Sequence, residues 1–191
     1  LNADGYNIEF AGSLRHGWYY ETTEGFDPDH EGHSGWHAEG GTGGGLLPNI
    51  YGWLSGNPAD IVLLHIGTND VSAGGEDAGE VDDILDTIDR YETDNGTTVD
   101  VIVARICNRQ YFDPDNPDSK QANTTAYNDA LETVVRNRVA AGDNLMLVDM
   151  EFYAGLNYDD DADGGDMWDN LHPYHTGYIK MANVWHEALV P

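Results

Sequence analysis

The order of apolar and polar positions along the chain first predicts a set of strands. The run Ile61–Ile66 is almost entirely apolar and begins with β-branched residues, which is typical of a strand buried on both faces. Apolar runs also predict buried strands over 99–106 and 145–148. A shorter alternating pattern predicts one more strand over 6–10.

Helical spacing appears between these strands. In the segment 81–88 apolar residues recur every three or four positions, and acidic residues fill the opposite face. The same spacing predicts a helix around 126–135 and a closing helix over 178–189, with Thr176 as a candidate N-cap. Strands that alternate with helices indicate the α/β class with a largely parallel sheet. A length of 191 residues indicates one domain over residues 1–191.

The charge balance narrows the expected partners and setting. Asp and Glu number 35 against 8 Lys and Arg, which gives a formal net charge of −27. Such a charge disfavours binding to nucleic acid or to an anionic membrane. Self-repulsion of this size is largely screened at about 1 M salt, where the Debye length is about 3 Å. We therefore expect a secreted, salt-adapted protein, and the single cysteine, Cys107, allows no intrachain disulfide.

Turn-forming residues, Gly67-Thr68-Asn69-Asp70, end the first buried strand abruptly. In a parallel sheet, ligands bind at the carboxyl ends of the strands. The side-chain amide of Asn69 would lie there and can donate a hydrogen bond to an oxyanion. The alternative is a strand followed by an ordinary polar turn.

A second candidate is Asp169-Asn170-Leu171-His172-Pro173, just before the last predicted helix. An aspartate three residues before a histidine can hold one ring nitrogen while the other acts as a general base. Asp169 and His172 are therefore candidate catalytic residues. The alternative is a loop aspartate beside a surface histidine.

The histidine-rich segment 29–37 allows two interpretations. A glycine in a tight loop, Gly35 or Gly32, can present a backbone N–H to an oxyanion. Alternatively, His30, His33 and His37 can bind zinc and support a metal-dependent hydrolase. That spacing suits one face of a helix, and the glycines and serine between the histidines disfavour a helix there.

A calcium site is a further candidate, although the expected chemistry requires no cofactor. Asp159, Asp161 and Asp163 are followed by Gly164, which matches the start of a calcium-binding loop. The bidentate glutamate expected at the twelfth position is replaced by Asn170. The alternative is a solvated acidic loop.

Taken in order, these motifs resemble those of the SGNH (GDSL-type) hydrolases. The strings Asp-His-Glu-Gly-His-Ser-Gly-Trp and Leu-Leu-His-Ile-Gly-Thr-Asn-Asp are most similar to family 3 carbohydrate esterases, acetyl xylan esterases in particular. The resemblance implies a three-layer α/β/α fold with a flavodoxin-like parallel sheet. It also implies Asn69 and Gly35, rather than Gly32, as oxyanion donors, His172 as the general base and Asp169 as its partner.

The resemblance also implies a part that the sequence lacks. The first block of this family is a strand that ends in Gly-Asp-Ser, whose serine is the nucleophile, and no Gly-Asp-Ser occurs here. The nearest match to this motif is Ser13, which follows Gly12. The nucleophile is therefore not identified. Without that first strand two sheet edges are unpaired. We expect the flanking strands to close up, another copy of the chain to donate a strand, or the chain to be a piece of a longer protein.

The implied function is removal of acetyl groups from a polysaccharide such as xylan by a serine-hydrolase mechanism. We expect the chain as given to be weak or inactive, because the nucleophile block is absent. A non-catalytic carbohydrate-binding module on the same fold is the alternative from another class. Aromatic side chains that can stack on sugar rings are Trp18, Tyr19, Tyr20, Trp36 and Trp168.

Overall fold

A parallel three-stranded sheet forms the centre of the computed structural model, which describes residues 5–16, 27–41, 43–75, 77–110 and 119–190. The strand order is β3-β4-β5, and Ile61 lies opposite Asp100 while Val101 lies opposite Leu145. The strands are β3 Ile61–Leu64, β4 Asp100–Arg105 and β5 Leu145–Asp149. These three confirm the predicted α/β class and its parallel sheet.

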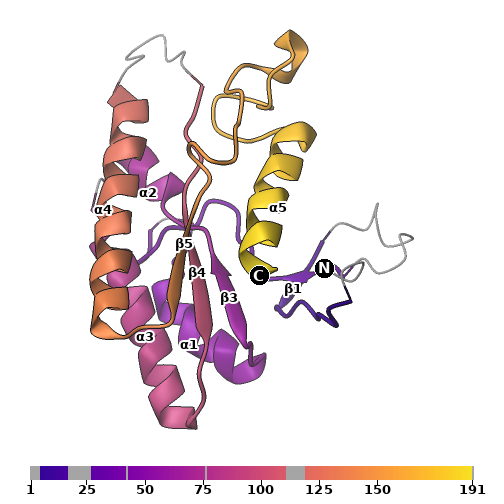
Figure 1. Ribbon diagram of the computed structural model, residues 1–191. Coiled ribbons are helices and arrows are strands. Elements are labelled where there is room, and N and C mark those ends of the chain that lie inside the picture. The colour runs from indigo at the N-terminus through magenta and orange to yellow at the C-terminus, as the bar shows by residue number, and fades with distance from the viewer. Residues whose placement is uncertain (1–4, 17–26, 42, 76, 111–118, 191) are drawn as a thin grey trace.

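Helices connect the strands and cover the sheet on both faces (Figure 1). They are α1 Leu47–Gly56, α2 Thr68–Ala73, α3 Gly79–Asn95, α4 Ser119–Ala141 and α5 His175–Leu189. Each of the helices that the hydrophobic spacing predicted is present. The closing helix starts at His175, with Tyr174 as its N-cap. Thr176 lies inside the first turn, where its side chain is hydrogen-bonded to Asp166, so its prediction as the N-cap is wrong.

The alternation of side chains along β4 divides the core into two layers. Val101 and Val103 belong to the cluster that contains the inner faces of α1, α3 and α4. Ile102 and Ala104 belong to the other cluster, together with Met181 of α5. Because successive residues of a strand point to opposite faces, this division confirms the three-layer α/β/α architecture.

The N-terminal region differs from the prediction. Residues 6–10 form no strand, and Tyr6, Ile8 and Phe10 are 41%, 36% and 46% exposed. A short antiparallel ribbon follows instead, formed by β1 Leu14–Arg15 and β2 Asp29–His30. One of the two strands expected to flank the missing strand is therefore absent. The prediction that the flanking strands close up is wrong.

The two outer strands are less buried than their apolar sequences predict. Within the described residues β3 is hydrogen-bonded only to β4, and Ile61 is 44% exposed. Met146 of β5 is 48% exposed. Burial on both faces is therefore confirmed for β4 and wrong for β3 and β5. Donation of a strand by another copy, and a homo-oligomer through these edges, stay predictions.

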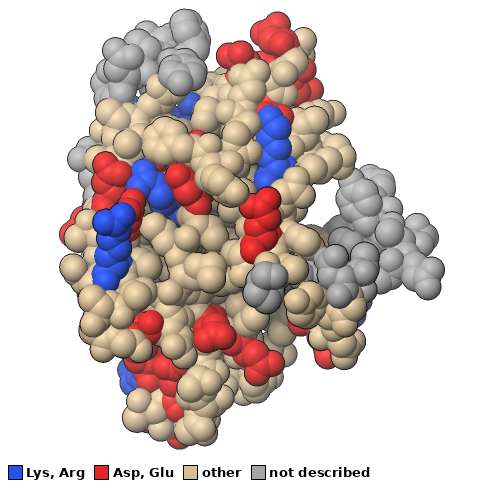
Figure 2. Space-filling model, viewed as in Figure 1, with Lys and Arg blue, Asp and Glu red and all other residues tan. Residues whose placement is uncertain are grey.

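Arg138 of α4 is a centre of charge pairing on the acidic surface. Its guanidinium contacts four carboxylates at 2.5 to 2.7 Å, three from α3 and one after α4: Asp82, Asp86, Asp89 and Asp143. Acidic side chains lie in several patches across the face shown in Figure 2, from its top to its bottom. Among the described residues, no helix is long and apolar enough to cross a membrane.

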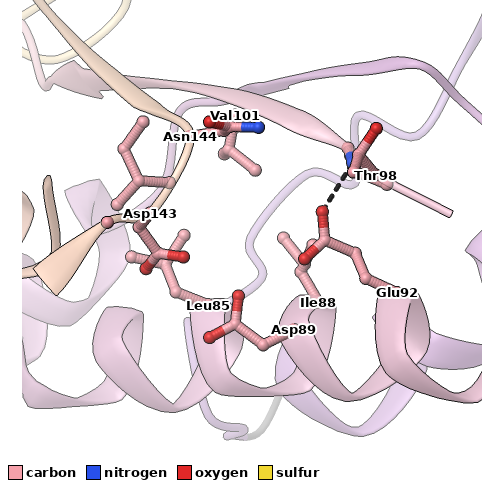
Figure 3. Close-up of a pocket in the computed structure, with 11 residues that line it drawn as sticks. Leu85, Ile88, Asp89, Glu92, Thr98, Val101, Asp143 and Asn144 are labelled. Carbon is pink, nitrogen blue, oxygen red and sulfur yellow. Dashed lines mark hydrogen bonds between the residues drawn. The ribbon is translucent and has the colours of Figure 1, made fainter. Parts of the chain in front are cut away.

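A hollow of about 110 Å³ opens at the amino-terminal edge of the sheet. Thr98 precedes β4 and Asn144 precedes β5 at its rim, and Asp89 and Glu92 of α3 point towards it (Figure 3). The backbone N–H of Val99 donates to Glu92 Oε1 at 2.6 Å. Ligands of parallel sheets bind at the opposite, carboxyl-terminal edge, so this hollow is not the candidate site.

Candidate active site

The turn after β3 aims Asn69 through a close packing contact. Gly67 has a φ of 118°, and a Cβ there would lie 2.2 Å from Cζ of Tyr127. The Tyr127 hydroxyl donates to the carbonyl of Ile66 at 3.0 Å. Only glycine fits this backbone conformation and this space. The chain therefore turns sharply into α2, and Asn69 lies in the first turn of that helix.

Asn69 and Asp70 hold the loop that carries Gly35. The amide of Asn69 donates to the carbonyl of Trp36 at 2.8 Å. The buried carboxylate of Asp70 accepts the N–H of Ala38 at 3.2 Å. The same carboxylate contacts the ring of His37 at 3.2 Å. The structure thus brings Asn69 and the Gly35 loop together, as the resemblance implied.

The two glycines proposed as backbone donors differ in their bonding. The N–H of Gly32 donates to Nδ1 of His30 at 2.9 Å. Gly35 is exposed at the turn with a φ of 77°, and its N–H has no partner among the described residues. An oxyanion needs a donor that is not already used, so the geometry favours Gly35 over Gly32.

Asp169 and His172 form a hydrogen-bonded pair. Nδ1 of His172 lies 3.0 and 2.9 Å from the two carboxylate oxygens of Asp169. The backbone N–H groups of Leu171 and His172 also donate to Oδ1 of Asp169, at 2.8 and 2.7 Å. Burial raises the pKa of Asp169, but the hydrogen bonds from His172 and Leu171 outweigh it and hold that pKa below its usual range. The carboxylate is therefore charged and orients the ring of His172, whose side chain is 62% exposed.

Both halves of the site lie at the carboxyl-terminal edge of the sheet, where α2 and the loop before α5 are found (Figure 1). The segment after β4 contacts each of them. Arg109 donates to Ser72 Oγ of α2 at 3.2 Å, and the N–H of Gln110 donates to the carbonyl of Asn170 at 3.2 Å. The roles that the resemblance implies require Asn69 and His172 to face one cleft, and those roles stay predictions.

The proposed zinc ligands do not come together. The ring of His30 is bonded to that of His16, His33 to the carboxylate of Glu31, and His37 to Asp70. No three His, Cys, Asp or Glu side chains among the described residues are grouped so as to hold a metal ion. The alternative of zinc at His30, His33 and His37 is therefore unsupported, because each ring contacts a different partner.

The calcium site at Asp159, Asp161 and Asp163 stays a prediction. Asp161 and Asp163 lie in a short 3-10 helix capped by the side chain of Asp160. Among the described residues, these three side chains do not form a ready-made metal-binding group.

Ser13 lacks the partner that a nucleophile needs. Its hydroxyl donates to Glu31 at 3.0 Å, and no serine hydroxyl in the described part of the chain is hydrogen-bonded to His172. Activation of a serine requires an adjacent base. Of the proposed aromatic platforms, Trp18, Tyr19 and Tyr20 lie outside the described residues.

Sequence reasoning missed a buried polar network between β4 and β5. Glu151 is 2% exposed and lines a hollow of about 240 Å³ at the carboxyl-terminal edge. Its carboxylate accepts hydrogen bonds from Arg105, Asn108, Thr125 and Asn128. The available signal was a polar residue within the apolar spacing of α4, Asn128, which is fully buried.

Comparison with known proteins agrees with this fold. A family 3 carbohydrate esterase of Clostridium thermocellum has a TM-score of 0.72 and 27% identity, with 97% of this chain and 79% of that one covered. A family 3 carbohydrate esterase of Talaromyces cellulolyticus has a TM-score of 0.74 and 27% identity, with 99% and 84% covered. The multidomain esterase of Ruminococcus flavefaciens is 28% identical over 174 residues, which are 86% of this chain.

The fold of this chain and its paired motifs are those of the SGNH hydrolases. The chain belongs to the GDSL-like lipase/acylhydrolase family, whose sequence profile matches residues 2–179. It spans 21% and 56% of the lengths of the two curated relatives that it matches.

Proposed function

We propose that the protein is a carbohydrate O-acetylesterase that removes acetyl groups from a polysaccharide such as xylan. The observation that carries this proposal is the Asp169–His172 pair at the carboxyl-terminal edge of a GDSL-family sheet. The names of its structural neighbours support a carbohydrate ester as the substrate, and an acetyl esterase solved with an acetate ion, at 27% identity and a TM-score of 0.74, supports the acetyl group.

Each residue has a defined role in this proposal. His172 takes a proton from the nucleophile and returns it to the leaving sugar oxygen, and Asp169 holds the ring in the orientation that this requires. The free amide hydrogen of Asn69 and the N–H of Gly35 stabilise the negative charge that develops on the carbonyl oxygen. Since the nucleophile of a serine hydrolase is not identified in the chain, we propose weak turnover for the chain as given.

The decisive experiment measures hydrolysis of p-nitrophenyl acetate and release of acetate from acetylated xylan. We expect His172→Ala to lower kcat by about 10²- to 10⁴-fold, as loss of a general base does. His175→Ala is the matched control, because it removes another exposed histidine three residues along the chain. Turnover that is equal in the wild type and in His172→Ala would contradict the proposal, and sugar binding without any turnover would favour a non-catalytic module.

The proposal includes a salt-rich setting outside the cell, where polymeric substrates are found. Its support is the net charge of −27 and the four aspartates that share Arg138. Screening of like charges should stabilise the fold. We expect the melting temperature to rise between low and molar KCl, measured by circular dichroism, and a flat or falling profile would exclude salt adaptation.

A further inference from the structure

A row of exposed aromatic side chains runs from the catalytic turn onto α5. Trp168, Tyr174 and Tyr178 are 64%, 37% and 54% exposed, and we call these three residues the aromatic row. The rings of Trp168 and Tyr174 are stacked, with centroids 5.8 Å apart and planes 13° from parallel. Tyr178 follows Tyr174 by one helical turn, and its N–H donates to the carbonyl of Tyr174 at 2.9 Å. Side chains at this spacing lie on one helix face.

The aromatic row is attached directly to the candidate catalytic pair. The N–H of Trp168 donates to the carbonyl of His172 at 2.8 Å. Met167 and Pro173 form an antiparallel bridge that closes the same turn. Trp168 and Tyr174 therefore flank, in the chain, the segment 169–172 that carries both members of the pair. A molecule lying on these rings would contact the turn that carries His172.

A buried clamp keeps the aromatic row in place. The carboxylate of Asp166, in a residue that is 5% exposed, accepts Nζ of Lys180 at 2.5 Å. Lys180 also donates to the carbonyl of Gly155 at 2.9 Å. At Gly177 a Cβ would lie 2.6 Å from the carbonyl oxygen of Asp166, so glycine allows the turn to pack closely on α5. The backbone that carries the rings is thus held before any ligand arrives, which lowers the entropy cost of binding.

The chemistry of the row selects its ligand. Flat, exposed and uncharged ring faces stack on the C–H faces of pyranose sugars, and a bound sugar chain presents several such faces in line. Four residues of helix rise about 6 Å, which is close to the length of one sugar unit in a β-1,4-linked chain. The large negative charge of the molecule repels acidic polymers. These observations favour a neutral polysaccharide.

We propose that the aromatic row is a subsite for a neutral β-linked polysaccharide and binds the sugars that flank the acetylated one. The placement of the ester beside His172 rests on the proposed esterase function, but sugar binding by the row does not. Trp168 is the residue that we expect to contribute most, because it has the largest ring and the largest exposed fraction of the three.

The test measures binding of xylohexaose to the intact protein by isothermal titration calorimetry. We expect Trp168→Ala to raise Kd at least about ten-fold, which corresponds to about 1.4 kcal/mol. Trp168→Phe should recover most of the affinity, because a ring face is kept. Tyr153→Ala is the matched control: Tyr153 is 68% exposed and its hydroxyl contacts Glu187 near the other end of α5, so we expect its Kd to stay within about two-fold.

Three results would overturn the subsite. They are an unchanged Kd in Trp168→Ala, no binding of xylo-, cello- or mannohexaose by the wild type at millimolar concentration, and a wild-type dimer in light scattering that Trp168→Ala converts to monomers. Xylohexaose carries no ester, so its binding is independent of hydrolysis. Binding that depends on Trp168, with no turnover that depends on His172, would leave the subsite standing and reject the esterase.

Discussion

The two halves of the candidate site are built in different ways. The oxyanion half depends on contacts between residues far apart in sequence, because Asn69 and the buried Asp70 hold residues 36–38. The base half is local: Asp169 is bonded to residues two and three positions later. The side chains of His172 and Asp169 are 62% and 45% exposed. The geometry of the first half therefore depends on the fold, and that of the second depends on one turn.

The largest expected effect that separates the halves is on catalysis. We expect Asn69→Ala to lower kcat for p-nitrophenyl acetate by about 10²- to 10³-fold, as the loss of one oxyanion donor does. The free energy of unfolding should fall by only about 1 kcal/mol, for one hydrogen bond to Trp36. Ser72→Ala, one turn further along α2, serves as the control. An undiminished kcat would remove Asn69 from the oxyanion half.

The next effect is on stability. Asp70→Asn removes the buried charge that accepts the N–H of Ala38 and contacts His37. We expect the free energy of unfolding to fall by about 1–3 kcal/mol in urea denaturation, because a buried acceptor is replaced. Asp60→Asn changes an exposed carboxylate just before β3 and should have no effect above about 0.5 kcal/mol. Equal results for the two variants would show that long-range contacts do not hold the oxyanion half.

The smallest effect concerns the pH dependence of the base half. The pKa of Asp169 is lower in the folded protein than its ordinary value, so its pairing stabilises the fold above about pH 4, the pKa region of an unfolded aspartate. That contribution is lost as the pH falls through the lower folded pKa. We expect the stability difference between the wild type and Asp169→Asn to shrink as the pH falls from 5 to 2. The difference should be small throughout, because the pair is largely exposed.

A difference that grows towards low pH would show that the sign of this interaction is wrong. The measurement is urea denaturation at several pH values at constant ionic strength. His175→Ala provides the baseline, since it changes a neighbouring exposed histidine outside the pair.

Sequence patterns predicted the parts of the fold that depend on local periodicity. The helices around 81–88 and 126–135 and the buried strand before Ile106 are present because apolar spacing alone determines which face packs inward. Residues 6–10 alternate as a strand does, but a strand needs a neighbour, and no described strand lies beside them. Strand pairing is a long-range property that alternation cannot report.

The same distinction applies to the site. The hydrogen bond between Asp169 and His172 was predictable, because the two residues are three positions apart in a single turn. The spacing of His30, His33 and His37 was a weak guide to a zinc site, because spacing says nothing about which partners compete for each side chain, as Glu31 does for His33. The buried Glu151 network joins residues that are up to 46 positions apart, and no short motif marks it.

The charged residues around Arg138 differ in how well the fold tolerates their substitution. Four aspartates converge on this one guanidinium, so losing any one of them relieves repulsion among the rest. Losing the arginine leaves four carboxylates facing one another, and lysine lacks the planar fork that reaches them all. We therefore expect the fold to tolerate the loss of any one of these carboxylates better than the loss of the cation that they share.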